Sequence, residues 1–172
     1  MRLPLMPALF AAALMAGTGA VAAGAPAPRL AQSSFAQLPQ PLPLPYDEAA
    51  NAHTDLAKAK ARAKAQHKLL LIDMGGNWCG DCRVLAGTMH LPQLAAFIDK
   101  HYVVVTVDVG RFSKNLDISA AYGIARPAGV PAILVVDPRS NTLVNAGHVT
   151  ALADARSMSP QALADWLAQW VR

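Results

Sequence analysis

The chain contains only two cysteines, Cys79 and Cys82, and just two residues separate them. A disulfide between them would close a very short loop, which removes little conformational entropy from the unfolded chain. Neither cysteine has a more distant partner in the sequence. The pair is therefore expected to have a chemical role rather than to stabilise the fold. The fold then has to place the two thiols where they can react.

The pair lies where a buried strand is predicted to meet a helix. The run Lys68–Met74 (KLLLIDM) is short and apolar, which indicates a buried strand. Gly75 and Gly76 end it, and a helix is predicted from Cys79 to about Ala86. Unpaired backbone N–H groups and the helix dipole stabilise negative charge at a helix start. We therefore expect an exposed, nucleophilic Cys79 whose pKa lies below that of a free thiol.

The rest of the chain alternates helices and strands. Residues 132–136 and the β-branched run 102–109 predict strands, and a further strand is expected near Leu143. Helices are predicted over 47–66, 92–100 and 113–122 with Ser113 as N-cap, and a closing helix is predicted to start at Ser159-Pro160 and to include Trp170. This order predicts an α/β fold in which helices flank a mixed central sheet.

Residues 1–22 are typical of a secretory signal peptide. Arg2 supplies the positive start, Leu3–Met15 the apolar stretch, and Ala20-Val21-Ala22 a small-residue cleavage site. Export, to the periplasm in a bacterium, is predicted, with no stable membrane span after cleavage; retention of the leader as an anchor is the alternative. Residues 23–45 are rich in Pro and Ala, which predicts a flexible linker ahead of a domain spanning 46–172.

The charge balance gives little reason to expect a nucleic-acid partner. The chain has 15 Lys and Arg against 11 Asp and Glu, a formal net charge of +4. Nucleic-acid binding needs a clustered basic face. The basic residues of 58–68 alternate with alanine on the predicted helix, so they are expected to form a solvated surface.

The sequence Trp78-Cys79-Gly80-Asp81-Cys82 follows a strand that carries Asp73, and Gly129-Val130-Pro131 comes later in the chain. This combination resembles the thioredoxin superfamily, and within it the exported bacterial thioredoxin-like proteins. The resemblance implies a thioredoxin fold from about Lys68 to the C-terminus. It also implies thiol–disulfide exchange on protein substrates, without a metal or organic cofactor and with an unknown redox partner supplying electrons.

Individual roles follow from the same resemblance. Cys79 corresponds to the attacking cysteine, Cys82 to the resolving cysteine and Asp73 to the buried acid that takes the proton of the resolving thiol. The residues expected at the substrate-binding surface are Trp78, Gly80, Asp81, Val130 and Pro131, with Pro131 in the place of the family's cis-proline. A lysine that lies near the buried acid in thioredoxin has no secure counterpart.

Asp81 stands where thioredoxin has a proline. A carboxylate beside Cys79 opposes ionisation of the thiol, so it partly offsets the helix dipole. A less stabilised thiolate gives a less oxidising disulfide. We therefore predict a reductase-like rather than a strongly oxidising potential.

Two other functions remain open at this point. A CxxC pair can hold Cu(I) or contribute half of a zinc site, and Met89 and His90 follow it closely. A structural zinc site needs four ligands, however, and neither a second CxxC pair nor a paired-histidine pattern is present. The other alternative is a non-catalytic binding module, although such a scaffold does not need a reactive pair.

Overall fold

The computed structural model describes residues 24–172 of the chain. The predicted signal peptide lies outside these residues. The strands form one sheet and are β1 (Leu69–Gly75), β2 (Tyr102–Asp108), β3 (Ala132–Asp137) and β4 (Thr142–Leu143). Their order is β2-β1-β3-β4, with β1 parallel to β2 and antiparallel to β3, and β3 antiparallel to β4. The predicted mixed sheet is confirmed.

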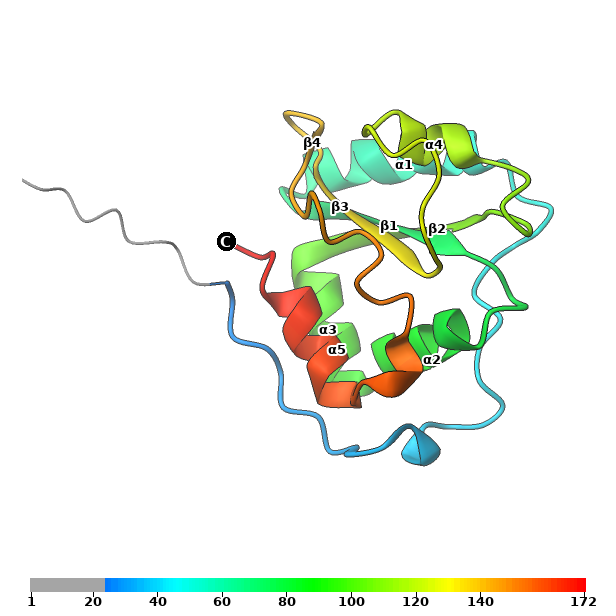
Figure 1. Cartoon of the computed structure of the whole chain (residues 1–172). Helices are drawn as coiled ribbons and strands as arrows, with labels where there is room; N and C mark the ends of the chain where they lie inside the picture. The colour runs from blue at the N-terminus through cyan, green and yellow to red at the C-terminus, as the bar shows by residue number, and fades with distance from the viewer. Residues whose placement is uncertain (1–23) are drawn as a thin grey trace, which may run out of the picture.

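Helices cover both faces of this sheet (Figure 1). One face carries α1 (Ala52–Ala65) and α4 (Leu116–Ala120), and the other carries α2 (Gly80–Met89), α3 (Pro92–His101) and α5 (Pro160–Ala168). Successive side chains of a strand point to opposite faces. Thus Ile72 of β1 packs in the cluster with α1, whereas Leu71 packs in the cluster with α2, α3 and α5. The α/β architecture predicted from the sequence is confirmed.

Two predicted helices begin later in the structure than in the sequence prediction. In each of them an asparagine is the N-cap residue and marks where the helix starts. α1 begins at Ala52 rather than at Asp47, since the side chain of Asn51 caps it by accepting the N–H of Thr54. α4 begins at Leu116 rather than after Ser113. Its N-cap, Asn115, has a φ of 58° and donates its side-chain N–H to the carbonyl of Asp108.

The N-terminal segment, residues 24–45, which the composition predicts as a flexible linker, makes packing contacts with the rest of the domain. It runs along the surface of α2, α3 and α5, in blue to cyan in Figure 1. Arg83 of α2 donates to the carbonyls of Leu42 and Pro43 at 2.9 and 3.2 Å. Leu38 is buried in a cluster with Val84 of α2. Proline disfavours regular helices and strands, but it does not prevent a segment from packing against a neighbouring surface.

Within residues 24–172, none of the helices combines the length and the apolar character that crossing a membrane requires.

Candidate active site

Cys79 lies at the junction of β1 and α2, where it is the N-cap residue of the helix. Its sulfur accepts the backbone N–H of Cys82 at 3.2 Å. This bond satisfies one of the N–H groups that a helix start leaves unpaired, and it places the sulfur at the positive end of the helix dipole. The predicted strand–turn–helix placement of the pair is thus what the structure shows.

The two thiols have opposite tendencies to ionise. The hydrogen bond with the Cys82 side chain is the largest influence on Cys79 and lowers its pKa to about 7, against the effects of burial and of the Asp81 charge. The same hydrogen bond, followed by burial, raises the pKa of Cys82. Near neutral pH, Cys79 is therefore the thiolate and Cys82 is the thiol that donates to it. This division suits a nucleophile and a second thiol held in reserve.

Cys79 is more enclosed than the sequence indicated. The residue is 6% exposed, and its sulfur lies 3.5 Å from the carbonyl oxygen of Val130. The expectation of an exposed thiol is therefore wrong, because the loop before β3 covers the sulfur. This loop contains the predicted Val130 and Pro131, and the peptide bond between them is cis.

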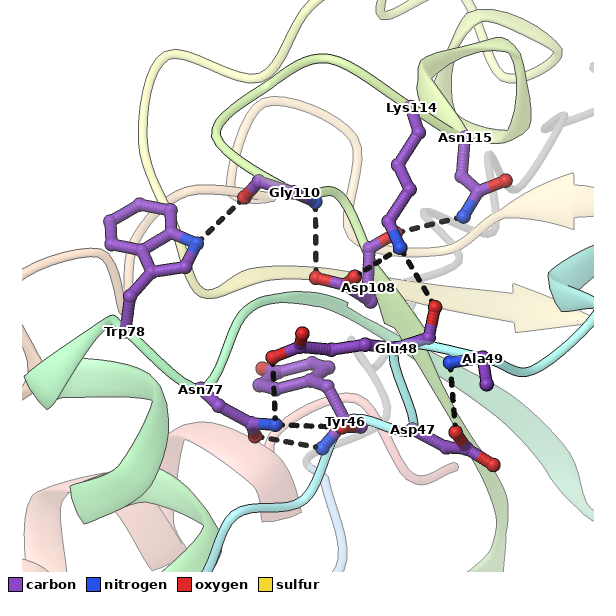
Figure 2. A network of polar contacts seen from close by, with 10 residues as sticks. All are labelled: Tyr46, Asp47, Glu48, Ala49, Asn77, Trp78, Asp108, Gly110, Lys114 and Asn115. Carbon is purple, nitrogen blue, oxygen red and sulfur yellow. Dashed lines mark hydrogen bonds and ion pairs between the residues drawn. The ribbon is translucent and has the colours of Figure 1, made fainter.

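Trp78 is the exposed member of the motif, with an exposed fraction of 42%. Its indole N–H donates to the carbonyl of Gly110 at 2.7 Å, as Figure 2 shows. The guanidinium of Arg111 lies 4.9 Å from the centre of the ring, and the ring of Phe112 lies 6.4 Å away. The indole is thereby held at the surface beside Cys79, where a bound protein would meet it.

Asp73 is buried beneath the cysteines, with 1% of its surface exposed. Burial raises the pKa of its carboxyl group from 3.8 to about 7, and a hydrogen bond from Tyr46 opposes part of this rise. The Tyr46 hydroxyl donates to Asp73 Oδ1 at 2.8 Å. A carboxyl group with this pKa can accept or release a proton at neutral pH.

Asp81 does not face the surface beside the cysteines. Its carboxylate accepts the backbone N–H and the Nε–H of Arg156 at 2.9 and 3.1 Å and forms an ion pair with Nη2 at 3.1 Å. Arg156 comes from the 3-10 helix η2 (Ala155–Ser157) and also lies over Gly80. These contacts pair the carboxylate with Arg156, and a part for Asp81 in substrate binding stays a prediction.

Sequence reasoning missed both Tyr46 and Arg156 as members of this site. They lie 27 and 75 positions from their carboxylate partners, Asp73 and Asp81. A lone tyrosine in a proline-rich segment and a lone arginine in a turn carry no local pattern, so the sequence offers no signal for either contact.

Among residues 24–172, no three or more side chains of His, Cys, Asp or Glu are grouped so that they could hold a metal ion. One ionisable side chain buried next to the cysteine pair is that of Asp73.

Comparison with known proteins places the chain in a family. The sequence model of a thioredoxin-like family matches residues 51–138. No curated protein matches the chain. A solved structure of a disulphide isomerase from Xylella fastidiosa Temecula1 shares 42% identity and a TM-score of 0.68, covering 74% of this chain and 96% of that one. A protein of unknown function from Pseudomonas aeruginosa shares 17% identity and a TM-score of 0.38, covering 70% of this chain and 84% of that one. With a family match over half of its length and a similar structure over most of it, this chain belongs to the thioredoxin superfamily.

Proposed function

We propose that the protein is a thiol–disulfide oxidoreductase that acts on protein substrates through Cys79 and Cys82. The observation that carries this proposal is the position of the Cys79 sulfur, which accepts the N–H of Cys82 at the start of α2. A thiolate held there attacks a substrate disulfide, forms a mixed disulfide and releases the first substrate sulfur as a thiolate. Cys82 then displaces the second substrate sulfur. The substrate gains two electrons, and the enzyme is left with a Cys79–Cys82 disulfide.

The ionisation of Cys79 favours a reductase or isomerase over a strong oxidase. The pKa of Cys79 is lowered to about 7, which is close to that of the active cysteine of thioredoxin. The active cysteine of the oxidase DsbA has a much lower pKa, about 3.5. The similar protein from Xylella fastidiosa is a disulphide isomerase, which supports a place for this chain among enzymes of disulfide exchange. Reduced protein is therefore the working form in this proposal, and a separate redox partner has to supply its electrons.

The redox potential of the cysteine pair tests this part of the proposal. We expect equilibration with glutathione buffers, followed by quantification of free thiols, to give a potential close to that of thioredoxin, about −270 mV. The physical reason is that Cys79 is ionised no more readily than in thioredoxin. A potential near about −120 mV, the value of DsbA, would assign the protein to the oxidases instead.

Export is part of the proposal and rests on the sequence of residues 1–22. A periplasmic location fits a dithiol enzyme, because disulfides form and persist in that compartment. To test export, the mass of the protein from the periplasmic fraction is measured and compared with the mass expected for a chain cleaved after Ala22. A full-length chain found in the cytoplasm would contradict export.

A further inference from the structure

The hydroxyl group of Tyr46 lies on the buried side of the cysteine pair, although Tyr46 itself precedes the part of the sequence that the family model matches. The match begins at residue 51, and Tyr46 immediately follows the N-terminal segment. The residue is 3% exposed, and its hydroxyl donates to Asp73 Oδ1. A buried hydroxyl that donates to one acceptor still has lone pairs with which to accept a proton from another group.

The second neighbour of this hydroxyl is the sulfur of Cys82, and Gly75 shows how close the two groups are. A Cβ atom placed on Gly75 would clash with Tyr46 Oη and would lie 2.7 Å from Cys82 Sγ. Tyr46 Oη and Cys82 Sγ thus both lie next to the place that a Cβ atom of residue 75 would occupy. The interaction with Cys82 is also among the causes that raise the pKa of Tyr46, after burial and Asp73.

We propose that the Tyr46 hydroxyl relays the proton of the Cys82 thiol to Asp73 when Cys82 resolves the mixed disulfide. This inference rests on the proposed function and adds to it the residue that joins the second thiol to the buried acid. It would make Tyr46 a catalytic residue, since its oxygen exchanges protons with the reacting thiol.

In the reduced enzyme the Cys82 thiol donates to the Cys79 thiolate, but in the mixed disulfide that negative charge is gone, so the thiol proton can turn to Tyr46 Oη. The Tyr46 hydroxyl proton moves to ionised Asp73 as the Cys82 proton moves to Tyr46. Cys82 sulfur forms a bond with Cys79 sulfur, and the bond between Cys79 and the substrate breaks. The substrate leaves as a thiolate, and Asp73 holds one proton more than before.

Asp73 has a route by which that proton can leave. A cavity of about 210 Å³ is lined by Asp73 together with Pro45, Thr106 of β2 and residues of α2 and α3. The titratable groups that share the cavity with Asp73 are His90 and Asp99, both exposed. On the other side, Asp73 faces Tyr46 and Cys82. A proton taken from Cys82 therefore reaches a carboxyl group that borders both the dithiol and an open cavity.

The backbone of Tyr46 is fixed directly to the active-site loop. The side chain of Asn77 accepts the N–H of Tyr46 at 3.1 Å and donates to its carbonyl at 2.8 Å. Figure 2 shows this pair of bonds, and beyond it Lys114, which donates to the carbonyl of Glu48 and pairs with Asp108. Because Asn77 directly precedes Trp78, these two hydrogen bonds connect Tyr46 to the loop that carries the cysteines.

The substitution Tyr46→Phe tests the relay, and Tyr102→Phe is its matched control. Tyr102 is also buried, and its hydroxyl donates to the carbonyl of Leu167 at 2.7 Å, so both variants lose one buried hydroxyl and its hydrogen bond. Reduced protein is mixed with a peptide disulfide, quenched with acid at intervals and analysed by mass spectrometry for the adduct on Cys79. The decay of this adduct measures resolution by Cys82 separately from the initial attack by Cys79.

For Tyr46→Phe we expect the adduct to persist about 100-fold longer at pH 7, the low end of what a positioned proton-transfer group contributes. Its decay should also need a higher pH, since the lost hydrogen bond had lowered the pKa of Asp73. Formation of the adduct should be unchanged, and Tyr102→Phe should match the wild type in both respects. Equal decay rates and equal pH profiles in all three proteins would overturn the relay while leaving the proposed function standing.

The wild type provides a second test that does not depend on the folding of a variant. A relay through Tyr46 moves two protons in the resolving step. A plot of the decay rate of the adduct against the fraction of D₂O in the solvent should therefore be curved. A linear fall, as for one proton moving directly to Asp73, would contradict the relay. A wild-type protein that forms no adduct at all would instead refute the proposed function, and the relay with it.

Discussion

Replacing Cys79 by serine lowers the reduction of insulin disulfides to the rate seen without protein. A serine hydroxyl is not ionised at neutral pH and cannot form a mixed disulfide, so the first step of exchange is lost. Cys82 does not substitute for it, because its side chain is fully buried and this burial, which the variant retains, raises the pKa of its thiol. The measurement is insulin turbidity with dithiothreitol as the electron donor, at equal concentrations of wild type and variant.

The control for this loss is Cys82→Ser, which removes a thiol of the same size from the same turn. That variant retains the nucleophile, so in the absence of dithiothreitol it should consume one substrate per protein and then stop as a stable adduct on Cys79. Stoichiometric adduct in Cys82→Ser and none in Cys79→Ser would assign the two roles. Turnover by Cys79→Ser equal to that of the wild type would defeat the enzyme proposal and favour a non-catalytic module.

Replacing Asp73 by asparagine makes the protein more stable above neutral pH and leaves it nearly unchanged in acid. Burial raises the pKa of the Asp73 carboxyl group from 3.8 in an exposed chain to about 7. The folded protein therefore binds this proton more tightly than the unfolded chain does. Stability falls as the pH rises from 3.8 to about 7 and then stays constant. The difference corresponds to about 4 kcal/mol, which the asparagine variant no longer loses.

The expected observation is a stability difference between variant and wild type that grows by about 4 kcal/mol between pH 3 and pH 8. Urea unfolding of the reduced proteins at several pH values measures it. The value at pH 3 is the internal control, because Asp73 is then protonated in both the folded and the unfolded state. A difference that does not change with pH would show that Asp73 is ionised in the folded protein without an energetic cost.

The sequence predicted the parts of this site that depend on neighbouring residues. The apolar run before Gly75 predicted the buried strand, and the glycines followed by Cys79 predicted the helix start. These features come from local hydrogen bonding and side-chain periodicity. The same holds for Ser159, which caps α5 by accepting the N–H of Ala162 as its Ser-Pro sequence predicts. The family resemblance supplied the fold, which is confirmed, and the positions of Val130 and Pro131.

Contacts between distant segments could not be predicted in this way. Arg156 neutralises Asp81, and Tyr46 approaches Asp73 and Cys82, only because the chain returns to α2 and β1 from elsewhere. The enclosure of Cys79 by the carbonyl of Val130 has the same origin. The contacts of the N-terminal segment with α2 could not be predicted either, since proline content indicates the absence of regular structure and says nothing about packing.

The rate of alkylation of Cys79 as a function of pH tests the central claim most directly. The Cys82→Ser protein is unsuitable for this purpose, because the hydrogen bond from Cys82 is the largest cause of the lowered pKa of Cys79. Reduced wild type is therefore treated with iodoacetamide, and the modified cysteine is identified by mass spectrometry. The account predicts modification of Cys79 before Cys82, with a rate that reaches half its maximum near pH 7. A half-maximal rate at about pH 8.5, the value of a free thiol, would contradict it.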